Sequence, residues 1–495
     1  MNDGTLPASR FPLPAPPRPS PSAPRPYHFP SFTRRRLENG IEIVVAPVHK
    51  LPLVTVIALV DAGAAADPDG REGLAQITAQ ALAEGTATMD GVALTDRVER
   101  LGTSLDTHAD WDTAFLRVTV EKGRLADALG LLGEVLLSPA FPERELERLK
   151  AERLAEILAQ RAEPRGLANE MFDRFTYAGS ARYSRPEGGS EASVAAIARD
   201  DVERFYRARY RPGNTTLVMA GDVTAEEGEQ LARQLFGVWA GARSGGRGAP
   251  PGEEVTDIYE AARRRSDAFG VVAPPVDAAA RSERVVHVVA KPDAPQSELR
   301  VGHVGLPRLH PDYFATTVMN AVLGGLFSSR INLNLREAHG YTHGASSAYD
   351  WRRAAGPFVV STAVRSDVTD AAAREILHEI DRVRAEPIAE EELSLATSYL
   401  DGVFPIRYES TAAIASALAN LVLYRLPDDY YDAYRGNIRG VTRDDVLAAA
   451  RAHLQPEQLQ IVAVGDADAI REPLAALGVG EVKLYDAEGR ERTTR

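Results

Sequence analysis

Hydrophobic and polar residues along the chain form short apolar runs and longer segments of helical periodicity. Apolar runs at 40–45 and 54–62 predict strands near the start, and runs at 284–289 and 298–305 predict strands in the second half. Helical periodicity follows the first pair of strands in four segments, 73–84, 92–101, 125–137 and 143–161. Strands followed by helices that cover one face of a sheet predict an α+β fold.

The chain contains an internal repeat, displaced by 244 positions from Arg199 to Arg443. Three segments recur, namely Arg-Asp-Asp-Val at 199–202 and 443–446, Pro at 212 and 456, and an apolar run ending in Gly-Asp at 217–222 and 461–466. Chance likeness between two helix-strand units is a poor explanation, because every matched residue shares the displacement. The repeat predicts two homologous lobes, each a mainly antiparallel sheet with helices packed on one face.

Composition divides the chain into five parts. Residues 1–32 are rich in proline and hold no apolar stretch typical of a secretory signal, so they predict a disordered leader. Residues 33–239 and 284–480 are expected to form the two lobes. Gly, Arg, Ser and Pro gather early in residues 240–283, which predicts a flexible linker. Residues 481–495 are expected to form a tail.

Charge and composition exclude several classes of function. With 44% hydrophobic and 26% charged residues, the chain is in the range of globular proteins. A net charge of -13 argues against nucleic-acid binding, which rests on clustered Lys and Arg. The absence of cysteine excludes disulfides, thiolate metal sites and cysteine nucleophiles.

The longest nearly apolar run, 53–60, is far below the roughly 20 residues that span a bilayer, so no membrane segment is expected. A cytoplasmic location follows, or a periplasmic one if a signal has been removed.

Short motifs in a fixed order carry a family resemblance. The first half has Arg-Leu-Glu-Asn-Gly at 36–40, Asp-Ala-Gly at 61–63, Gly-Leu at 73–74 and Glu-Gly-Thr at 84–86. The second half has Leu-Gly-Gly at 323–325, Ser-Ser-Arg at 328–330, Asn-Leu-Arg-Glu at 334–337 and Gly-Tyr-Thr at 340–342. In order and spacing, these motifs resemble the pitrilysin/insulinase superfamily of zinc peptidases from residue 33 to about 478. The resemblance implies half of a clamshell-shaped peptidase, with Gly324 and Gly325 in a substrate loop.

The resemblance also implies a zinc site that this sequence lacks. Family members bind zinc on a helix with the motif His-x-x-Glu-His, in which two imidazoles share one helical face and the Glu acts as general base. The corresponding residues here are Gln76, Ala79 and Gln80, and none of them can take these roles. Glu156 matches a third family ligand, but a single carboxylate does not retain zinc. We therefore expect no metal and no cofactor to be bound by this chain.

A replacement metal site was sought among the ten histidines. Only His339 and His343 stand four residues apart, the spacing at which two imidazoles share one face of a helix. Gly340 and the β-forming residues after it predict that a helix ends and a strand begins between them. The two rings are therefore not expected to share a face or bind a metal.

The segment around these histidines has another role by resemblance. Family members place an Arg and a Tyr from the second half over the zinc, where they hold the substrate carbonyl and stabilise its oxyanion. Arg336 matches the Arg, His343 stands where the family has Tyr, and Tyr341 lies two residues earlier. Either His343 donates the hydrogen bond in place of the phenol, or the site is decaying.

Three functions are compatible with these residues. The leading hypothesis is a non-catalytic subunit that pairs with a zinc-bearing homologous subunit and forms a metalloendopeptidase chamber for unfolded peptides, with the zinc held by the partner. Such peptides add as a strand to a sheet edge, for which 105–113 and 115–120 are the candidates. The alternatives are a structural or peptide-binding protein without a peptidase role, and an active homodimeric metallopeptidase.

Overall fold

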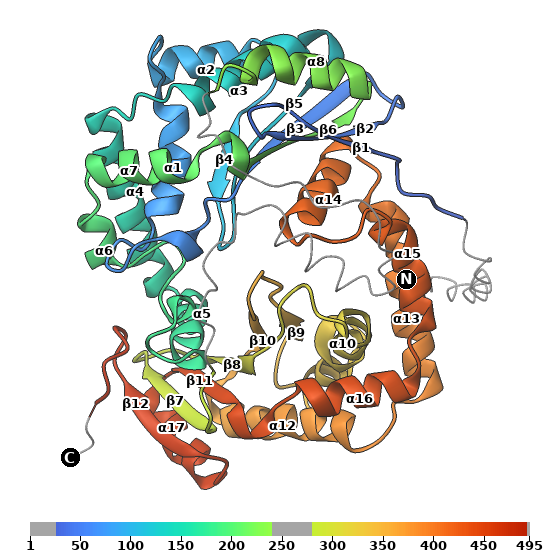
Figure 1. Ribbon diagram of the computed structural model, residues 1–495. Coiled ribbons are helices and arrows are strands. Elements are labelled where there is room, and N and C mark those ends of the chain that lie inside the picture. Colours follow the sequence, from blue (N-terminus) through green and yellow to red (C-terminus); the bar gives the residue numbers. More distant parts are fainter. Residues whose placement is uncertain (1–25, 240–279, 493–495) are drawn as a thin grey trace, which may run out of the picture.

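The computed structural model describes residues 26–239 and 280–492. They form two lobes, the N-lobe (26–239) and the C-lobe (280–492), each built on a six-stranded sheet. The lobes lie one above the other in Figure 1. Among the described residues, no helix has the length and apolar character needed to cross a membrane.

The N-lobe sheet has the strand order β1-β2-β6-β3-β5-β4 and is antiparallel except between β2 and β6. Its strands are β1 (Thr33–Arg36), β2 (Glu42–Pro47), β3 (Leu53–Val60), β4 (Asp106–Ala109), β5 (Ala114–Glu121) and β6 (Thr215–Gly221). Its α-helices are α1 (Leu74–Ala81), α2 (Gly91–Glu99), α3 (Leu125–Leu137), α4 (Glu143–Ala162), α5 (Pro164–Thr176), α6 (Glu191–Ala195), α7 (Arg199–Arg209) and α8 (Ala225–Phe236). Short 3-10 turns are η1 (Ala64–Ala66), η2 (Leu82–Glu84), η3 (Lys122–Arg124), η4 (Arg182–Ser184) and η5 (Pro212–Asn214).

The C-lobe sheet has the order β12-β7-β11-β8-β10-β9. Its strands are β7 (Val285–Ala290), β8 (Gln296–Val304), β9 (Ala345–Tyr349), β10 (Pro357–Arg365), β11 (Gln460–Gly465) and β12 (Glu481–Tyr485). Its α-helices are α10 (Tyr313–Asn320), α11 (Arg330–Asn332), α12 (Thr369–Ala385), α13 (Glu390–Arg407), α14 (Thr411–Leu423), α15 (Tyr430–Gly440), α16 (Arg443–His453) and α17 (Ala467–Ala476). Two π-helical turns, η6 (Ala321–Gly325) and η7 (Leu333–Ala338), and two 3-10 turns, η8 (Ser366–Val368) and η9 (Pro456–Gln458), complete it.

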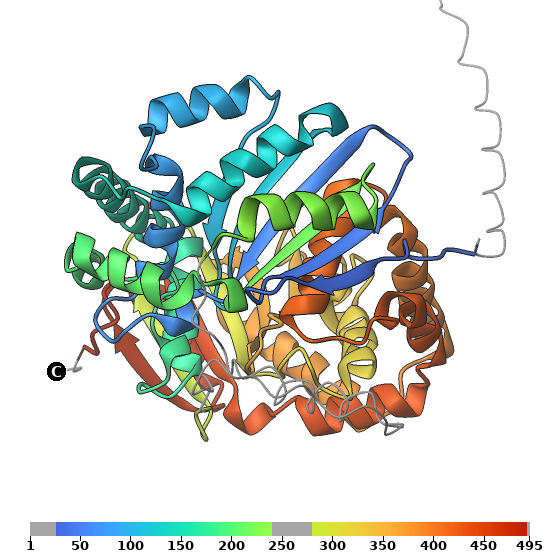
Figure 2. The ribbon, with the colours of Figure 1, turned by 45° about the horizontal axis from the view of Figure 1, so that its top comes forward.

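The central strands of each sheet are buried on both faces, which explains why they are apolar at almost every position. In β2, Ile43 and Val45 join the core formed with α1, α3 and α8, while Val44 and Ala46 join the core on the opposite face. This alternation follows from the two-residue period of a strand. Figure 2 shows α3 and α8, in teal and green, lying across the outer face of the N-lobe sheet.

The second face of each sheet is covered by a helix from the other lobe. Helix α14 of the C-lobe packs on β3 and β6, and α5 of the N-lobe packs on β8 and β11 (Figure 1). On α5 the contacts come from residues one turn apart, among them Leu167, Met171 and Phe175. The predicted α+β lobes with helices on one face are thus confirmed, and the exchanged helices, which the sequence did not predict, interlock the two lobes.

The internal repeat is confirmed in three dimensions. The repeated Arg-Asp-Asp-Val motifs begin α7 and α16, the prolines begin η5 and η9, and the apolar runs form the central strands β6 and β11. The third residue of each motif caps its helix, since Asp201 accepts a hydrogen bond from the N–H of Ala198 (3.0 Å) and Asp445 accepts one from Thr442 (2.9 Å). These caps satisfy backbone donors that the first turn leaves free.

Two predicted boundaries are wrong. Residues 481–485 are not a tail but form β12, which pairs with β7 at the edge of the C-lobe sheet. The leader also contains an ordered end, because Phe29 is 6% exposed and stacks on Tyr431 with 4.5 Å between ring centroids. The backbone N–H of Phe29 also donates a hydrogen bond to the carboxylate of Asp432 (3.3 Å). Residues 1–25 of the predicted leader and 240–279 of the predicted linker lie outside the described residues.

Candidate functional site

The residues that replace the zinc motif lie on α1, as the sequence predicted. Gln76 and Gln80, one turn apart, are half-buried, and Ala79 is fully buried. The buried carboxylate of Asp67 fixes the start of the helix by accepting hydrogen bonds from the N–H groups of Gly73 (2.8 Å) and Ala75 (2.8 Å). Burial raises the pKa of Asp67 to about 6, although nearby Arg182 acts in the opposite direction.

An arginine, Arg153, lies next to Glu156 in the region that corresponds to the zinc site. Arg153, one turn earlier on α4, is 9% exposed and donates to Glu156 (Nη1–Oε2 3.0 Å) and to the carbonyl of Gly188 (2.9 Å). A Cβ placed on Gly188 would lie 2.3 Å from Arg153 Nη2 and 2.4 Å from Gln76 Oε1. The guanidinium therefore lies beside both Gln76 and Glu156, two of the positions that correspond to zinc ligands.

These residues do not fit zinc. Zinc sites are built from imidazole, thiolate and carboxylate donors, and two of the three ligand positions here are amides. The third, Glu156, has its side chain 55% exposed and is already paired with Arg153. A fixed positive charge so close to the remaining carboxylate repels a dication, which adds to the loss of ligands. The structure thus supplies a feature, Arg153, that the sequence analysis missed.

Arg336 lies on the π-helical turn η7 at the surface of the C-lobe. Its side chain is 37% exposed, and the guanidinium carbon lies 4.7 Å from the ring centroid of Phe327, a cation-π contact. Its ion pair with Glu337 is long, at 3.5 Å. Wider π-helical turns are frequent at functional sites. Arg336 is thus held from one side and open on the other.

The neighbouring residues are arranged as the sequence suggested. Gly340 has φ +64° and ends the helix that precedes it, so His339 lies at the helix end and His343 lies in the exposed loop before β9. The ring of Tyr341 stacks on His339, with 4.9 Å between centroids. Within the described part of the chain, neither histidine belongs to a group of three metal-ligand side chains.

The glycine pair of the predicted substrate loop lies in η6. A Cβ on Gly324 would lie 2.4 Å from Ser347 Oγ and 2.6 Å from its backbone nitrogen, so only glycine lets η6 pack this closely on β9. Gly325 has Asn320 as its nearest neighbour, 3.0 Å from a built Cβ. The close packing gives Gly324 a structural role, and a role in substrate binding stays a prediction.

The predicted edge of the N-lobe is an edge in the structure. Among the described residues, β4 ends the N-lobe sheet and pairs only with β5, and β9 ends the C-lobe sheet in the same position of the repeat. Edge strands present unpaired backbone groups that can bind an extended peptide. Asp106 and Arg117 form an ion pair across β4 and β5 (2.8 Å).

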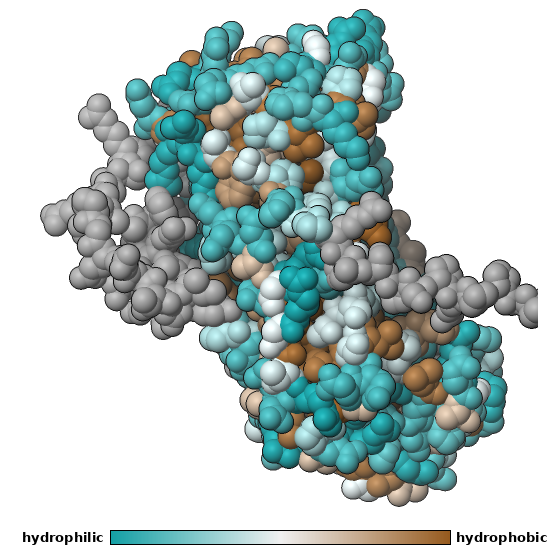
Figure 3. Space-filling model, turned by 90° about the vertical axis from the view of Figure 1, so that its right-hand side faces the viewer, coloured by the Kyte–Doolittle hydropathy of each residue, from teal (hydrophilic) through white to brown (hydrophobic). Residues whose placement is uncertain are grey.

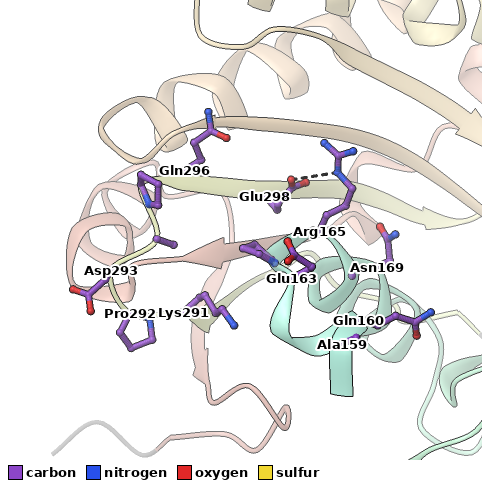
Figure 4. A pocket seen from close by; sticks show the side chains of 14 residues that line it. Ala159, Gln160, Glu163, Arg165, Asn169, Lys291, Pro292, Asp293, Gln296 and Glu298 are labelled. Carbon is purple, nitrogen blue, oxygen red and sulfur yellow. Dashed lines mark hydrogen bonds and ion pairs between the residues drawn. The ribbon is translucent and has the colours of Figure 1, made fainter. Parts of the chain in front are cut away.

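Two further features were not predicted. A cavity of about 900 Å³ lies where α4 and α5 meet the turn between β7 and β8 (Figure 4). Charged groups of both signs line it, and Arg165 pairs with Glu298 across the lobes (3.5 Å). A second feature is a group of three metal-ligand side chains, the only one among the described residues, formed by His310, Asp312 and His453. Both combine segments far apart in the sequence, which local patterns do not reveal.

Comparisons with protein families match both lobes. Residues 44–184 match "Insulinase (Peptidase family M16)", and residues 196–400 match "Peptidase M16 inactive domain". The chain belongs to the pitrilysin/insulinase superfamily. The first match lies within the N-lobe, whereas the second runs from just before α7, in the last part of the N-lobe, into α13 of the C-lobe.

Individual relatives are distant, and two of the three described here match over most of their length. An uncharacterized zinc protease of Streptomyces coelicolor is 23% identical over 84% of this chain and 86% of its own. A non-peptidase homologue of Helicobacter pylori is 22% identical over 86% and 92%. A probable mitochondrial-processing peptidase subunit beta of Schizosaccharomyces pombe is 23% identical over 60% and 59%.

Solved structures share the fold. The peptidase M16 inactive domain from Pseudomonas fluorescens has a TM-score of 0.77 at 24% identity, covering 88% of this chain and 98% of its own. A structure described as a protease from Helicobacter pylori has a TM-score of 0.78 at 17% identity, covering 88% and 100%.

Proposed function

We propose that this chain is the non-catalytic subunit of a heterodimeric M16 metalloendopeptidase that acts on unfolded peptides. The observation that carries the proposal is Arg153, whose guanidinium contacts Glu156 and lies beside Gln76. Zinc at this site would need imidazole, thiolate or carboxylate ligands, but two of the three positions are amides and the one carboxylate is paired with Arg153. The catalytic zinc would be held by a homologous partner.

Arg336 supports a contribution to the partner's site. The guanidinium is oriented by Phe327 and is only loosely paired with Glu337, so it is free to bind a carbonyl oxygen or an oxyanion. His343 and Tyr341 lie within seven residues of it and carry hydrogen-bond donors. They would assist Arg336, and no catalytic step is assigned to the N-lobe of this chain.

Exposed apolar residues on α13 and on the segment that holds Arg336 offer the partner a place to bind. We name them the α13 patch, which consists of Phe327, Leu333, Leu395 and Tyr399, each 43–70% exposed. Leu395 and Tyr399 are one turn apart on α13, and the ion pair between Arg330 and Glu392 (2.6 Å) joins α13 to the Arg336 segment. Figure 3 views the molecule from the side on which α13 lies and shows brown hydrophobic residues among teal ones on both lobes.

The names of two relatives agree with a pair made of a zinc-bearing and a non-catalytic subunit. One relative is named as a probable subunit of a processing peptidase, and another as a non-peptidase homologue. A chain that has lost its ligands but keeps the fold and Arg336 would combine the two properties. We propose that the pair works in the cytoplasm, which fractionation of cells that make the chain would test.

Co-expression tests the proposal. The chain alone, a zinc-bearing homologue from the same genome alone, and the two together are assayed for cleavage of a quenched unstructured peptide. We expect cleavage by the pair and at least about tenfold less by the homologue alone, corresponding to roughly 1.4 kcal/mol of transition-state stabilisation. In the pair, Arg336→Ala should lower kcat at unchanged pairing, whereas Arg365→Ala, which removes an exposed arginine paired with Asp367, should not.

Two results would contradict the proposal. Cleavage by this chain alone, abolished by a chelator, would show an active homodimer. A chain that binds extended peptide or a protein assembly, but neither pairs with nor activates the homologue, would favour the structural or peptide-binding alternative.

A further inference from the structure

Three polar side chains converge where α10 and α16 meet in the C-lobe. His310 and Asp312 lie in the turn that leads into α10, and His453 is the last residue of α16. Each offers one ligand atom, and the three atoms lie within 4.8 Å of one another. The two helices pack together in the lower part of Figure 1. The fold thus joins two imidazoles and a carboxylate, although Asp312 and His453 are 141 positions apart.

The group is already held together without a metal. His453 Nε2 and Asp312 Oδ2 are 2.6 Å apart, and the N–H of Asp312 donates to Nδ1 of His310 (3.1 Å). The two imidazole rings meet edge to face, with 5.0 Å between centroids. These contacts place the three ligand groups together, and a metal ion that binds the same nitrogen and oxygen atoms would replace the two hydrogen bonds.

We propose that His310, Asp312 and His453 bind one divalent transition-metal ion, for which Zn²⁺ is the probe. Two imidazoles and one carboxylate are the donors that such ions take in three-ligand protein sites. Ligand atoms at about 2.0–2.1 Å from a tetrahedral ion are roughly 3.4 Å apart, so the 2.6 Å contact between His453 Nε2 and Asp312 Oδ2 must open when an ion binds. The side chain of Asp312 is 49% exposed and free to rotate, while the side chain of His453 is 12% exposed and fixed by its helix.

The site differs from the degenerate zinc motif in its place and its role. It lies in the C-lobe, whereas Gln76 and Glu156 lie on α1 and α4 of the N-lobe. A bound ion would tie the beginning of α10 to the end of α16 and stabilise the C-lobe. Three protein ligands leave a position open, and His310 also lines a cavity of about 160 Å³ with Arg308 and Tyr430, from which water or a small anion can reach the ion. The proposal stands independently of the heterodimer.

Calorimetric titration of the chelator-treated full-length chain with Zn²⁺ tests the site, with Mg²⁺ as the contrasting ion. We expect one equivalent of Zn²⁺ to bind, no measurable binding of Mg²⁺, and a rise of several degrees in Tm with Zn²⁺. His310→Ala and His453→Ala should each weaken binding at least tenfold. The matched control is His339→Ala, which removes an exposed histidine 4.0 Å from Glu375 and should leave the titration unchanged.

A second measurement covers the case in which His453→Ala does not fold. Asp312→Asn keeps the size of an exposed side chain and should weaken Zn²⁺ binding, and Co²⁺ should give a visible absorption band that His310→Ala abolishes. Absence of binding at micromolar Zn²⁺, or binding that survives both His310→Ala and Asp312→Asn, would overturn the proposal. Loss with His339→Ala alone would place the ion elsewhere.

Discussion

The ring of Phe175, on α5 of the N-lobe, stacks on the imidazole of His287, in β7 of the C-lobe. The centroids are 4.2 Å apart and the rings are 6° from parallel. His287 is 2% exposed and its Nε2 lies 2.9 Å from Gln460 Oε1. A titratable ring thus lies in the contact that the exchanged helix makes with the opposite sheet.

This contact predicts a loss of stability in acid. Burial lowers the pKa of His287 from 6.5 to about 4, so the unfolded chain binds a proton between pH 6.5 and pH 4 that the folded chain does not. Stability therefore falls as the pH drops through this window, by about 3 kcal/mol when the loss is complete. His287→Phe keeps a stacked ring without the charge, and chemical denaturation at pH 7 and pH 4.5 should show a smaller difference than in the parent chain.

The control for this prediction is His108→Phe. His108 is exposed on the edge strand β4, so its removal should leave the pH dependence as it was. An unchanged difference in His287→Phe would place the acid sensitivity elsewhere, for instance at His303, whose pKa burial also lowers to about 4.

Arg153 predicts that restoring the histidines alone does not restore zinc binding. Gln76→His and Gln80→His complete two imidazoles and Glu156, but the guanidinium stays paired with Glu156 at 3.0 Å. Adding Arg153→Met should tighten Zn²⁺ binding at least about tenfold, since a positive charge a few Å away costs a dication more than about 1.4 kcal/mol. The measurement is competition with a zinc-sensitive dye, with His310→Ala in every variant so that the C-lobe group does not contribute.

The matched control for Arg153 lies on the same helix. Arg148→Met removes a half-exposed arginine that is paired with Glu84, Glu145 and Glu152, away from the site. It should not improve binding by the two restored histidines. Equal Zn²⁺ affinity with and without Arg153→Met would show that the missing ligands alone explain the lost site.

Replacing two glycines by alanine should change stability in opposite directions, one through close packing and the other through helix propensity. In β8, a Cβ on Gly302 would lie 1.9 Å from the carbonyl oxygen of Phe358 and 2.8 Å from Phe172 Cζ of the exchanged helix α5. Gly302→Ala should therefore cost about 3 kcal/mol of unfolding free energy. Gly402→Ala on α13 meets nothing within 4 Å and should stabilise by roughly 1 kcal/mol, because alanine favours a helix. Urea denaturation of both variants measures these effects, and similar values would contradict the packing argument.

The sequence predicted what depends on local periodicity and on motifs. The helices that begin near Gly73, Leu125 and Glu143, the repeat and the edge strand β4 follow from residues a few positions apart. Superfamily membership followed from the order of short motifs. Loss of the zinc motif followed from three positions on one helix.

The features that the sequence did not predict depend on contacts between distant segments. Nothing near Leu167 or Met171 shows that α5 covers the C-lobe sheet, because an apolar helix face does not specify its partner. The 481–485 segment was taken for a tail because its five residues, of which three are half-buried, one is exposed and one is buried, give a weak strand pattern. Arg153 lies among charged residues of α4, and its burial and its contact with Gly188, which appear only in the fold, distinguish it from a solvated arginine.

The α13 patch predicts where pairing is disrupted. Tyr399 is 51% exposed beside Leu395, so a charge at this position would be buried without a partner if the homologous subunit covers α13. Tyr399→Glu should weaken the pair at least about tenfold in light scattering or co-elution, since a desolvated charge costs more than about 1.4 kcal/mol. The chain alone should keep its Tm, because Tyr399 is not part of the buried core.

Val92→Glu is the matched control, because it places a charge at a 77% exposed apolar residue on α2 of the N-lobe. Equal loss of pairing in both variants would show a nonspecific effect, and full pairing of Tyr399→Glu would place the interface away from Arg336.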